Sequence, residues 1–201
     1  MYPLGLDAGT ATFNDLSTFT SSIGSGSFTQ TFDSFGAGAV PSPLSISGGG
    51  YSISASDDSR TFFNVGPAPD VWLSTSSSDL EISFSFSGPL PTAAGGYFFL
   101  TDATGNFQAG EISVLLNNNT KINRTVDSSS SFLGFTSDGG ISSIAFLAPV
   151  HYATVNNLVV GQVAPVAVPE SSTLGLLGLG VLVLWSSYTW RRKTLPNSRE
   201  I

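Results

Sequence analysis

The chain has no cysteine, one histidine and one methionine among its 201 residues, and only 10% of the residues are charged. The absence of cysteine excludes disulfide bonds, structural zinc held by thiolates, and thiol catalysis. The single histidine, His151, would have to serve any Ser-His-Asp site, and no Gly-x-Ser-x-Gly sequence accompanies it. We therefore predict no catalytic residue and interpret His151 as an exposed loop residue.

Charged residues that favour helices are scarce, whereas Ser, Thr, Gly and Phe are abundant. Short segments of alternating apolar and polar residues, ended by Gly, Pro, Asp or Asn, are typical of half-buried antiparallel strands. The clearest covers residues 80–86, where four apolar residues from Leu80 to Phe86 would face a core. Other strands are predicted over residues 27–32, 51–55, 97–100, 111–116, 132–136, 141–146 and 153–160.

About nine or ten strands at this spacing favour an all-β fold, an antiparallel β-sandwich of jelly-roll type over residues 1–162. A barrel is the alternative. Residues 137–140 are predicted to form the hairpin loop between the strands on either side. Before residue 170, the only helix that we expect is a single turn at residues 15–19.

The charge is unevenly distributed. Residues 1–168 hold twelve acidic against three basic residues, a net charge of −9, whereas residues 169–201 hold two acidic against four basic residues, a net charge of +2. The acidic body repels phosphate backbones, so nucleic acid is not an expected partner. We expect no cofactor, with Ca²⁺ held by acidic loops as the alternative. The loop acids, each in a turn context, are Asp57, Asp58, Asp102, Asp127 and Asp138.

The C-terminal region has three successive parts. A Pro/Ala/Val linker covers residues 163–172, and residues 173–190 are predicted to form one transmembrane helix, whose uncharged run would span roughly 25 Å. The basic residues Arg191, Arg192 and Lys193 then form a membrane stop at the start of the tail 191–201. Because basic flanks stay in the cytoplasm, the body is expected outside the inner membrane. A buried core helix is the alternative, disfavoured because the segment is apolar on every face.

Val168, Pro169 and Glu170, followed by a Leu/Gly-rich helix and a basic cluster, resemble the PEP-CTERM sorting signal of Gram-negative and cyanobacterial exported proteins. Ser171 stands where that motif has its second proline. The resemblance implies recognition by an exosortase, a membrane processing protease that would cut near Pro169 and Glu170. The protein would then reach the cell surface or be secreted.

The first seven residues have neither the basic start nor the apolar core of a signal peptide. Because the sorting signal implies export, we expect a truncated chain, a processed chain or a late start codon. A cytoplasmic tail-anchored protein is the alternative.

Residues 132–161 are similar to the last strands of bacterial exported jelly-roll domains, which commonly close with Asp-Asn-Leu. Here Asn156, Asn157 and Leu158 match that segment. The resemblance implies a carbohydrate-binding or lectin-like module. Four aromatic residues could either stack on sugar rings or fill the core of the sandwich: Trp72, Tyr51, Tyr97 and Tyr152.

The sequence thus predicts a non-enzymatic exported surface or matrix protein, associated with exopolysaccharide or biofilm. A carbohydrate-binding module, dependent on Ca²⁺ or not, is the first alternative. A glycoside hydrolase is the second, and it would need two convergent carboxylates. No such pair stands out in the sequence.

Overall fold

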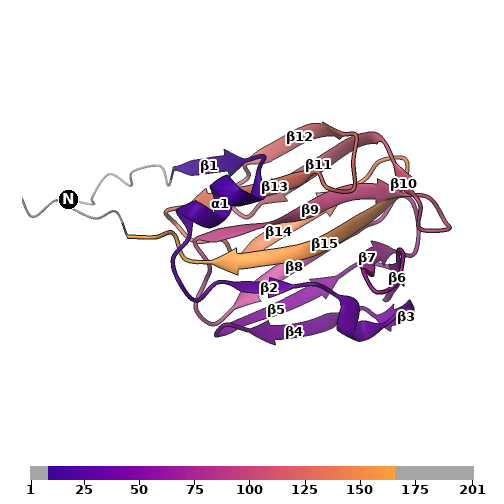
Figure 1. The fold of residues 1–201 in the computed structure, drawn as a ribbon, viewed down its shortest axis with the longest axis horizontal. Helices are drawn as coiled ribbons and strands as arrows, with labels where there is room; N and C mark the ends of the chain where they lie inside the picture. Colours follow the sequence, from indigo (N-terminus) through magenta and orange to yellow (C-terminus); the bar gives the residue numbers. More distant parts are fainter. Residues whose placement is uncertain (1–8, 166–201) are drawn as a thin grey trace, which may run out of the picture. The chain divides into compact units, whose positions relative to one another are not determined.

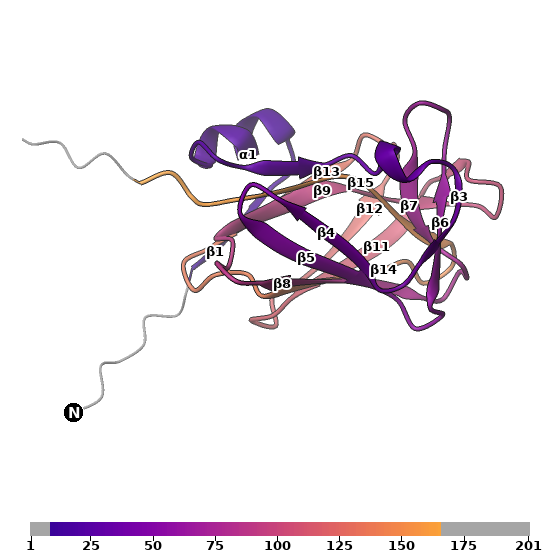
Figure 2. The ribbon, with the colours of Figure 1, turned by 90° about the horizontal axis from the view of Figure 1, so that it is seen from below.

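Two antiparallel β-sheets packed face to face make up residues 9–165, which are the residues that the computed structural model describes (Figures 1 and 2). This confirms the predicted all-β sandwich. The sorting motif Val168–Glu170, the predicted helix 173–190 and the basic residues 191–193 lie outside the described residues. Within residues 9–165, no helix has the length and apolar character needed to cross a membrane.

The first sheet has β9 and β15 at its centre, paired over most of their length. Its order is β1 (Thr10–Phe13), β13 (Phe132–Ser137), β9 (Ala93–Thr101), β15 (Tyr152–Gly161), β7 (Trp72–Thr75), β6 (Thr61–Val65) and β3 (Gly38–Pro41). Two short strands join it from the side: β2 (Phe28–Gln30) pairs with β15, and β10 (Phe107–Gln108) pairs with β9.

The second sheet alternates cleanly between a buried and a solvent face. Its order is β12 (Lys121–Val126), β11 (Gly110–Leu116), β14 (Ser143–Leu147), β8 (Glu81–Ser87), β5 (Tyr51–Ser56) and β4 (Leu44–Gly48). On β8, Ile82, Phe84 and Phe86 are buried while the intervening residues reach solvent. The predicted period of two is therefore confirmed, and serine dominates the solvent face of β4, β5 and β8.

The predicted hairpin at residues 137–140 is wrong. β13 pairs with β1 and β9 in the first sheet, whereas β14 pairs with β8 and β11 in the second. The chain crosses between the sheets at this loop because Ser137 N donates to Thr92 O at 2.8 Å and Ile141 N donates to Pro91 O at 2.7 Å. The described residues also contain fifteen strands rather than nine or ten, and the additional ones are short.

The helix α1 (Leu16–Ser22) covers part of the outer face of the first sheet (Figure 1). Asp15 caps it, accepting a hydrogen bond from Thr18 N at 2.8 Å. The fully buried Phe19 ring packs against Phe132 of β13, with centroids 5.3 Å apart. A turn was predicted at residues 15–19, and the helix continues to Ser22 because this apolar contact stabilises it. A single 3₁₀ turn, η1, follows at Asp33–Phe35.

Candidate functional site

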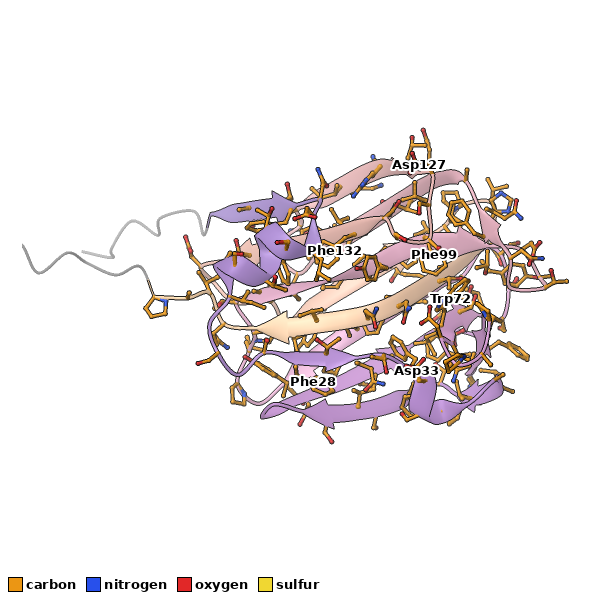
Figure 3. All side chains as sticks on the ribbon, in the orientation of Figure 1. Phe28, Asp33, Trp72, Phe99, Asp127 and Phe132 are labelled. Atoms are coloured by element: carbon orange, nitrogen blue, oxygen red, sulfur yellow. The ribbon has the colours of Figure 1, made fainter. Side chains whose placement is uncertain are left out.

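The outer face of the first sheet carries aromatic and amide side chains beside the region that α1 covers. Tyr97 on β9 lies opposite Asn156 on β15 and opposite Phe132 on β13, so these three side chains share one face. Figure 3 shows Phe132 near α1, with Phe99 and Trp72 farther along the same sheet. The half-buried Tyr97 ring packs edge-on against Phe132 at 5.7 Å. This part of the face is therefore built on the paired strands β13, β9 and β15.

The carboxylate of Asp70 lies beside these aromatic residues, and two buried donors fix its position. Asn156 Nδ2 donates to one carboxylate oxygen at 2.9 Å, and Trp72 Nε1 donates to the other at 3.2 Å. Asp70 itself is exposed, whereas Trp72 is 9% and Asn156 6% exposed. Because each carboxylate oxygen has two acceptor positions, Asp70 keeps one free position on each oxygen for a ligand.

The loop that carries Asp70 is held from two sides. Val71 N donates to Asp33 Oδ1 at 3.0 Å, which ties the loop to η1. On the other side, Gly66 has a φ of +101° and lies against the indole, so that a Cβ at this position would be 2.8 Å from Cδ2 of Trp72. Only glycine tolerates both the positive φ and this close approach to the indole. The loop is therefore packed directly on the Trp72 ring.

An irregularity in β15 positions Asn156 beside Asp70. The pairing of β15 with β9 shifts register between Asn156 and Val159, as at a β-bulge. Asn157 adopts a positive φ of 48°, which asparagine tolerates better than most residues, and its N–H donates to Asn156 Oδ1 at 2.8 Å. The bulge thus fixes the Asn156 amide so that its Nδ2 points to Asp70.

These residues line a pocket of about 220 Å³, here called the Asp70 pocket. Asp70, Trp72, Tyr97, Asn156 and Asn157 form its walls, and the remaining lining residues are Ser129 and Ser130. Its volume is below the roughly 300–1,000 Å³ of pockets that enclose a drug-sized ligand. It is open to solvent, and its size suits one small polar unit.

The acidic turn after β9 confirms the structural interpretation of Asp102. Asp102 Oδ1 accepts hydrogen bonds from Thr104 Oγ1 at 2.7 Å, Thr104 N at 2.9 Å and Asn106 N at 2.9 Å. The Thr104 hydroxyl, followed by the Asn106 N–H, lowers the pKa of Asp102 to about 2. This carboxylate therefore stays charged at neutral pH and orders the turn.

The other residues singled out in the sequence lie apart from the Asp70 pocket. His151 lies in the β14–β15 loop as predicted, but it is half-buried and not exposed, because it packs beside Glu111 and Val150. The turn acids Asp57, Asp58, Asp127 and Asp138 all follow the ends of strands, as predicted. Tyr51 is buried, and Tyr152 lies near Asp102. Among residues 9–165, no three His, Asp or Glu side chains lie close enough together to hold a metal ion.

Sequence reasoning found part of this site. Trp72 and Tyr97 were candidates for sugar stacking, and Asn156 and Asn157 were matched through the jelly-roll resemblance. The Trp72 indole, however, is covered by Gly66 and by Phe99, whose ring meets it edge-on at 4.9 Å. Trp72 therefore holds Asp70 in place, and the half-buried Tyr97 is the ring available to a ligand. Asp70 was missed, because Pro-Ala-Pro-Asp gives no signal beyond that of a loop.

No family model and no curated protein matches the sequence. One solved structure that resembles the chain is the catalytic unit of a thermostable GH87 alpha-1,3-glucanase from Streptomyces thermodiastaticus, at 13% identity and a TM-score of 0.35. The match covers 75% of this chain and 29% of that structure, so the chain spans less than a third of its length. A likeness at this level is too weak to indicate a shared ligand or activity.

Proposed function

We propose that residues 9–165 form a binding module for a neutral carbohydrate, and that the chain is an exported protein of the cell surface or extracellular matrix. One observation supports the binding role above all others: the exposed Asp70 carboxylate is held by the buried donors Asn156 Nδ2 and Trp72 Nε1. A carboxylate with fixed orientation and free acceptor positions suits adjacent hydroxyl donors, which sugars supply in pairs.

The rest of the pocket complements a sugar ring. Tyr97 offers an aromatic face with a polar tip, and Ser129 and Ser130 add hydroxyl groups that both donate and accept. Because the binding groups are positioned before the ligand arrives, little ordering is needed on binding. The volume of about 220 Å³ matches one sugar unit better than a larger ligand.

The charge of the body favours a neutral glycan over an anionic one. Residues 1–168 carry a net charge of −9, and the pocket contains Asp70 without a basic residue among those that line it. An acidic polysaccharide would meet repulsion both at a distance and inside the pocket. The exopolysaccharide partner that we propose is therefore a neutral one.

The chemistry of the Asp70 pocket favours sugar binding over glycoside hydrolysis. Glycoside hydrolysis uses a pair of carboxyl groups on either side of the scissile bond. Among the residues that the structure describes, Asp70 is the single carboxylate lining its pocket. A lone carboxylate that already accepts two hydrogen bonds is better suited to holding hydroxyl groups than to proton transfer.

The sorting proposal is supported by the order of the motif Val168–Glu170, the apolar run 174–190 and the cations Arg191, Arg192 and Lys193. An exosortase-type protease would act at the Pro169-Glu170 motif and release the body from the inner membrane.

Cell fractionation tests whether the tail is processed at this motif. Glu170→Ala is expected to keep the chain in the membrane fraction at full mass, whereas the unmodified chain appears at the surface in a shorter form. Identical distribution of both chains would contradict the proposal.

The binding proposal is tested by titrating the full chain with neutral mono- and oligosaccharides and following tryptophan fluorescence. The double substitution Trp185→Phe and Trp190→Phe leaves Trp72, which contacts Asp70, as the only tryptophan. Asp70→Asn should weaken binding at least tenfold, because hydrogen bonds to a charged group contribute about 1.5–3 kcal/mol.

The matched control is Asp138→Asn, an exposed acid outside the pocket, which should bind as the unmodified chain does. Titrations with added Ca²⁺ and with a chelator separate a calcium-dependent module from an independent one. No response to any neutral saccharide, or equal binding by Asp70→Asn, would overturn the carbohydrate proposal.

A further inference from the structure

We infer that the ligand is a chain of neutral sugar units and not a single sugar, because a second pocket that could hold a further unit shares Trp72 with the Asp70 pocket. This inference rests on the proposed carbohydrate binding and names the ligand class of that same site. A single sugar would use the Asp70 pocket alone, whereas a polymer would continue past Trp72 into the second pocket.

The second pocket has a volume of about 430 Å³ and is here called the Phe107 pocket. It shares Trp72 with the Asp70 pocket, and both pockets are open to solvent. Its other lining residues are Gly66, Pro67, Thr104, Gly105, Asn106 and Phe107. Because Trp72 lines both pockets, one extended ligand can occupy them in sequence.

Aromatic packing through the buried Phe99 links Phe107 to Trp72, the residue that lines both pockets. Phe107 is half-buried on β10, and its ring lies 6.4 Å from that of Phe99 on β9. Phe99 in turn meets the Trp72 ring at 4.9 Å with an interplanar angle of 88°. Figure 3 shows Trp72 and Phe99 close together on this side of the first sheet. Phe107 therefore offers the second pocket an aromatic surface, as Tyr97 does in the first.

The Phe107 pocket is fixed before a ligand arrives. Gly105 has a φ of +82°, and a Cβ at this position would lie 2.8 Å from Cβ of Val65. The turn that contains Gly105 is held by Asp102, which accepts from Thr104 and Asn106. The turn is thus packed tightly against the end of β6. A preformed wall of this kind gives a defined subsite, because the protein loses little conformational entropy when a ligand binds.

The chemistry of the second pocket also suits a neutral sugar. Thr104 and Asn106 are exposed and carry uncharged polar groups. The neighbouring Asp102 carboxylate is charged, which disfavours an anionic sugar here as it does at Asp70. The two subsites therefore select the same class of monomer, as expected for a homopolymer or a neutral copolymer.

The test is a series of neutral gluco-oligosaccharides from one to six units, in both α- and β-linked forms, titrated against the full chain. Affinity should rise at least tenfold between the monosaccharide and the longer oligomers. Phe107→Ala should remove most of this rise, and Asp70→Asn should weaken binding at every length. Phe107→Leu keeps apolar volume on β10 but removes the ring. Asn106→Ala removes an exposed side chain that donates to Thr104 Oγ1 at 2.7 Å and to Asp102 Oδ2 at 3.3 Å, so these two variants serve if Phe107→Ala folds poorly.

Leu115→Ala, at an exposed position on β11 away from both pockets, is the control and should reproduce the unmodified length dependence. Binding that does not change with length, or a full length dependence in all the Phe107 and Asn106 variants, would overturn the second subsite while leaving the Asp70 site intact. Binding of no oligosaccharide at any length would instead contradict the carbohydrate proposal itself.

Discussion

Asn156 and Asp70 are 86 positions apart in the sequence, yet Asn156 Nδ2 donates to Asp70 Oδ1 at 2.9 Å. The contact joins a bulge on the central strand β15 to the loop before β7. Asn156 is buried and Asp70 is exposed, so the pair links the interior of the sheet to the solvent-exposed side of the pocket. It is the structural basis of the proposed site.

Asn156→Ala should therefore affect both stability and binding. The substitution removes one of the two donors that hold Asp70, and we expect a loss of about 1–2 kcal/mol in the free energy of unfolding together with weaker saccharide binding. Urea denaturation measures the first effect. Asn123→Ala, at an exposed position on β12, is the matched control and should stay within about 0.5 kcal/mol of the unmodified chain. Equal effects of the two variants would contradict the role given to Asn156.

Gly66→Ala tests the close contact between the Asp70 loop and Trp72. A Cβ there would meet Cδ2 of Trp72 at 2.8 Å in addition to the strain of a positive φ. Gly26 has a similar φ of +96° with no atom within 4 Å of its Cβ position, so Gly26→Ala carries the backbone strain alone. We expect Gly66→Ala to be less stable than Gly26→Ala by at least about 1 kcal/mol in urea denaturation. Similar losses for the two would show that the loop does not need this contact.

Phe19→Ala tests the packing of α1 on the first sheet. Phe19 is fully buried against Phe132 and Phe13, and its removal leaves a cavity in a small separate cluster. We expect a loss of roughly 3–5 kcal/mol, measured by thermal or urea denaturation. Leu115→Ala, at a position 39% exposed, should cost far less. A cost below about 1 kcal/mol for Phe19→Ala would mean that α1 adds little to stability.

The lowered pKa of Asp102 predicts how the stability of the fold changes at acidic pH. Its folded-state pKa of about 2 lies below its ordinary value of 3.8, so it stabilises the fold above pH 4 and loses this effect as the pH falls toward 2. The difference in melting temperature between the unmodified chain and Asp102→Asn should therefore shrink between pH 4 and pH 2. Asp127→Asn, in the turn after β12, controls for the loss of one negative charge. A difference that stays constant down to pH 2 would exclude the proposed hydrogen bonds to the carboxylate.

The sequence indicated the strands whose two faces differ in polarity, because the period of two is visible in a segment such as Glu81–Ser87. It failed at residues 137–140, because local turn residues do not show whether the next strand pairs with the last one or crosses to the other sheet. The crossing depends on contacts with Pro91 and Thr92, more than forty positions away in the chain.

The candidate site was only partly predictable for the same reason. The Asn-Asn pair at residues 156–157 interrupts an apolar strand and is visible in the sequence, as are Trp72 and Tyr97. Asp70 follows two prolines in a segment without periodicity, and its partners are the neighbouring Trp72 and the distant Asn156. Only the pairing of β15 with β7 brings these partners to the same place.

The measurement that tests the central claim most directly is a ¹⁵N NMR titration of the full chain with a neutral oligosaccharide, following the side-chain N–H signals of Trp72 and Asn156. Both groups donate to Asp70, so both signals should shift together and saturate with a single dissociation constant. Saccharide binding that leaves both signals unmoved, or no shift with any neutral saccharide, would contradict the assignment of the Asp70 pocket as a carbohydrate site.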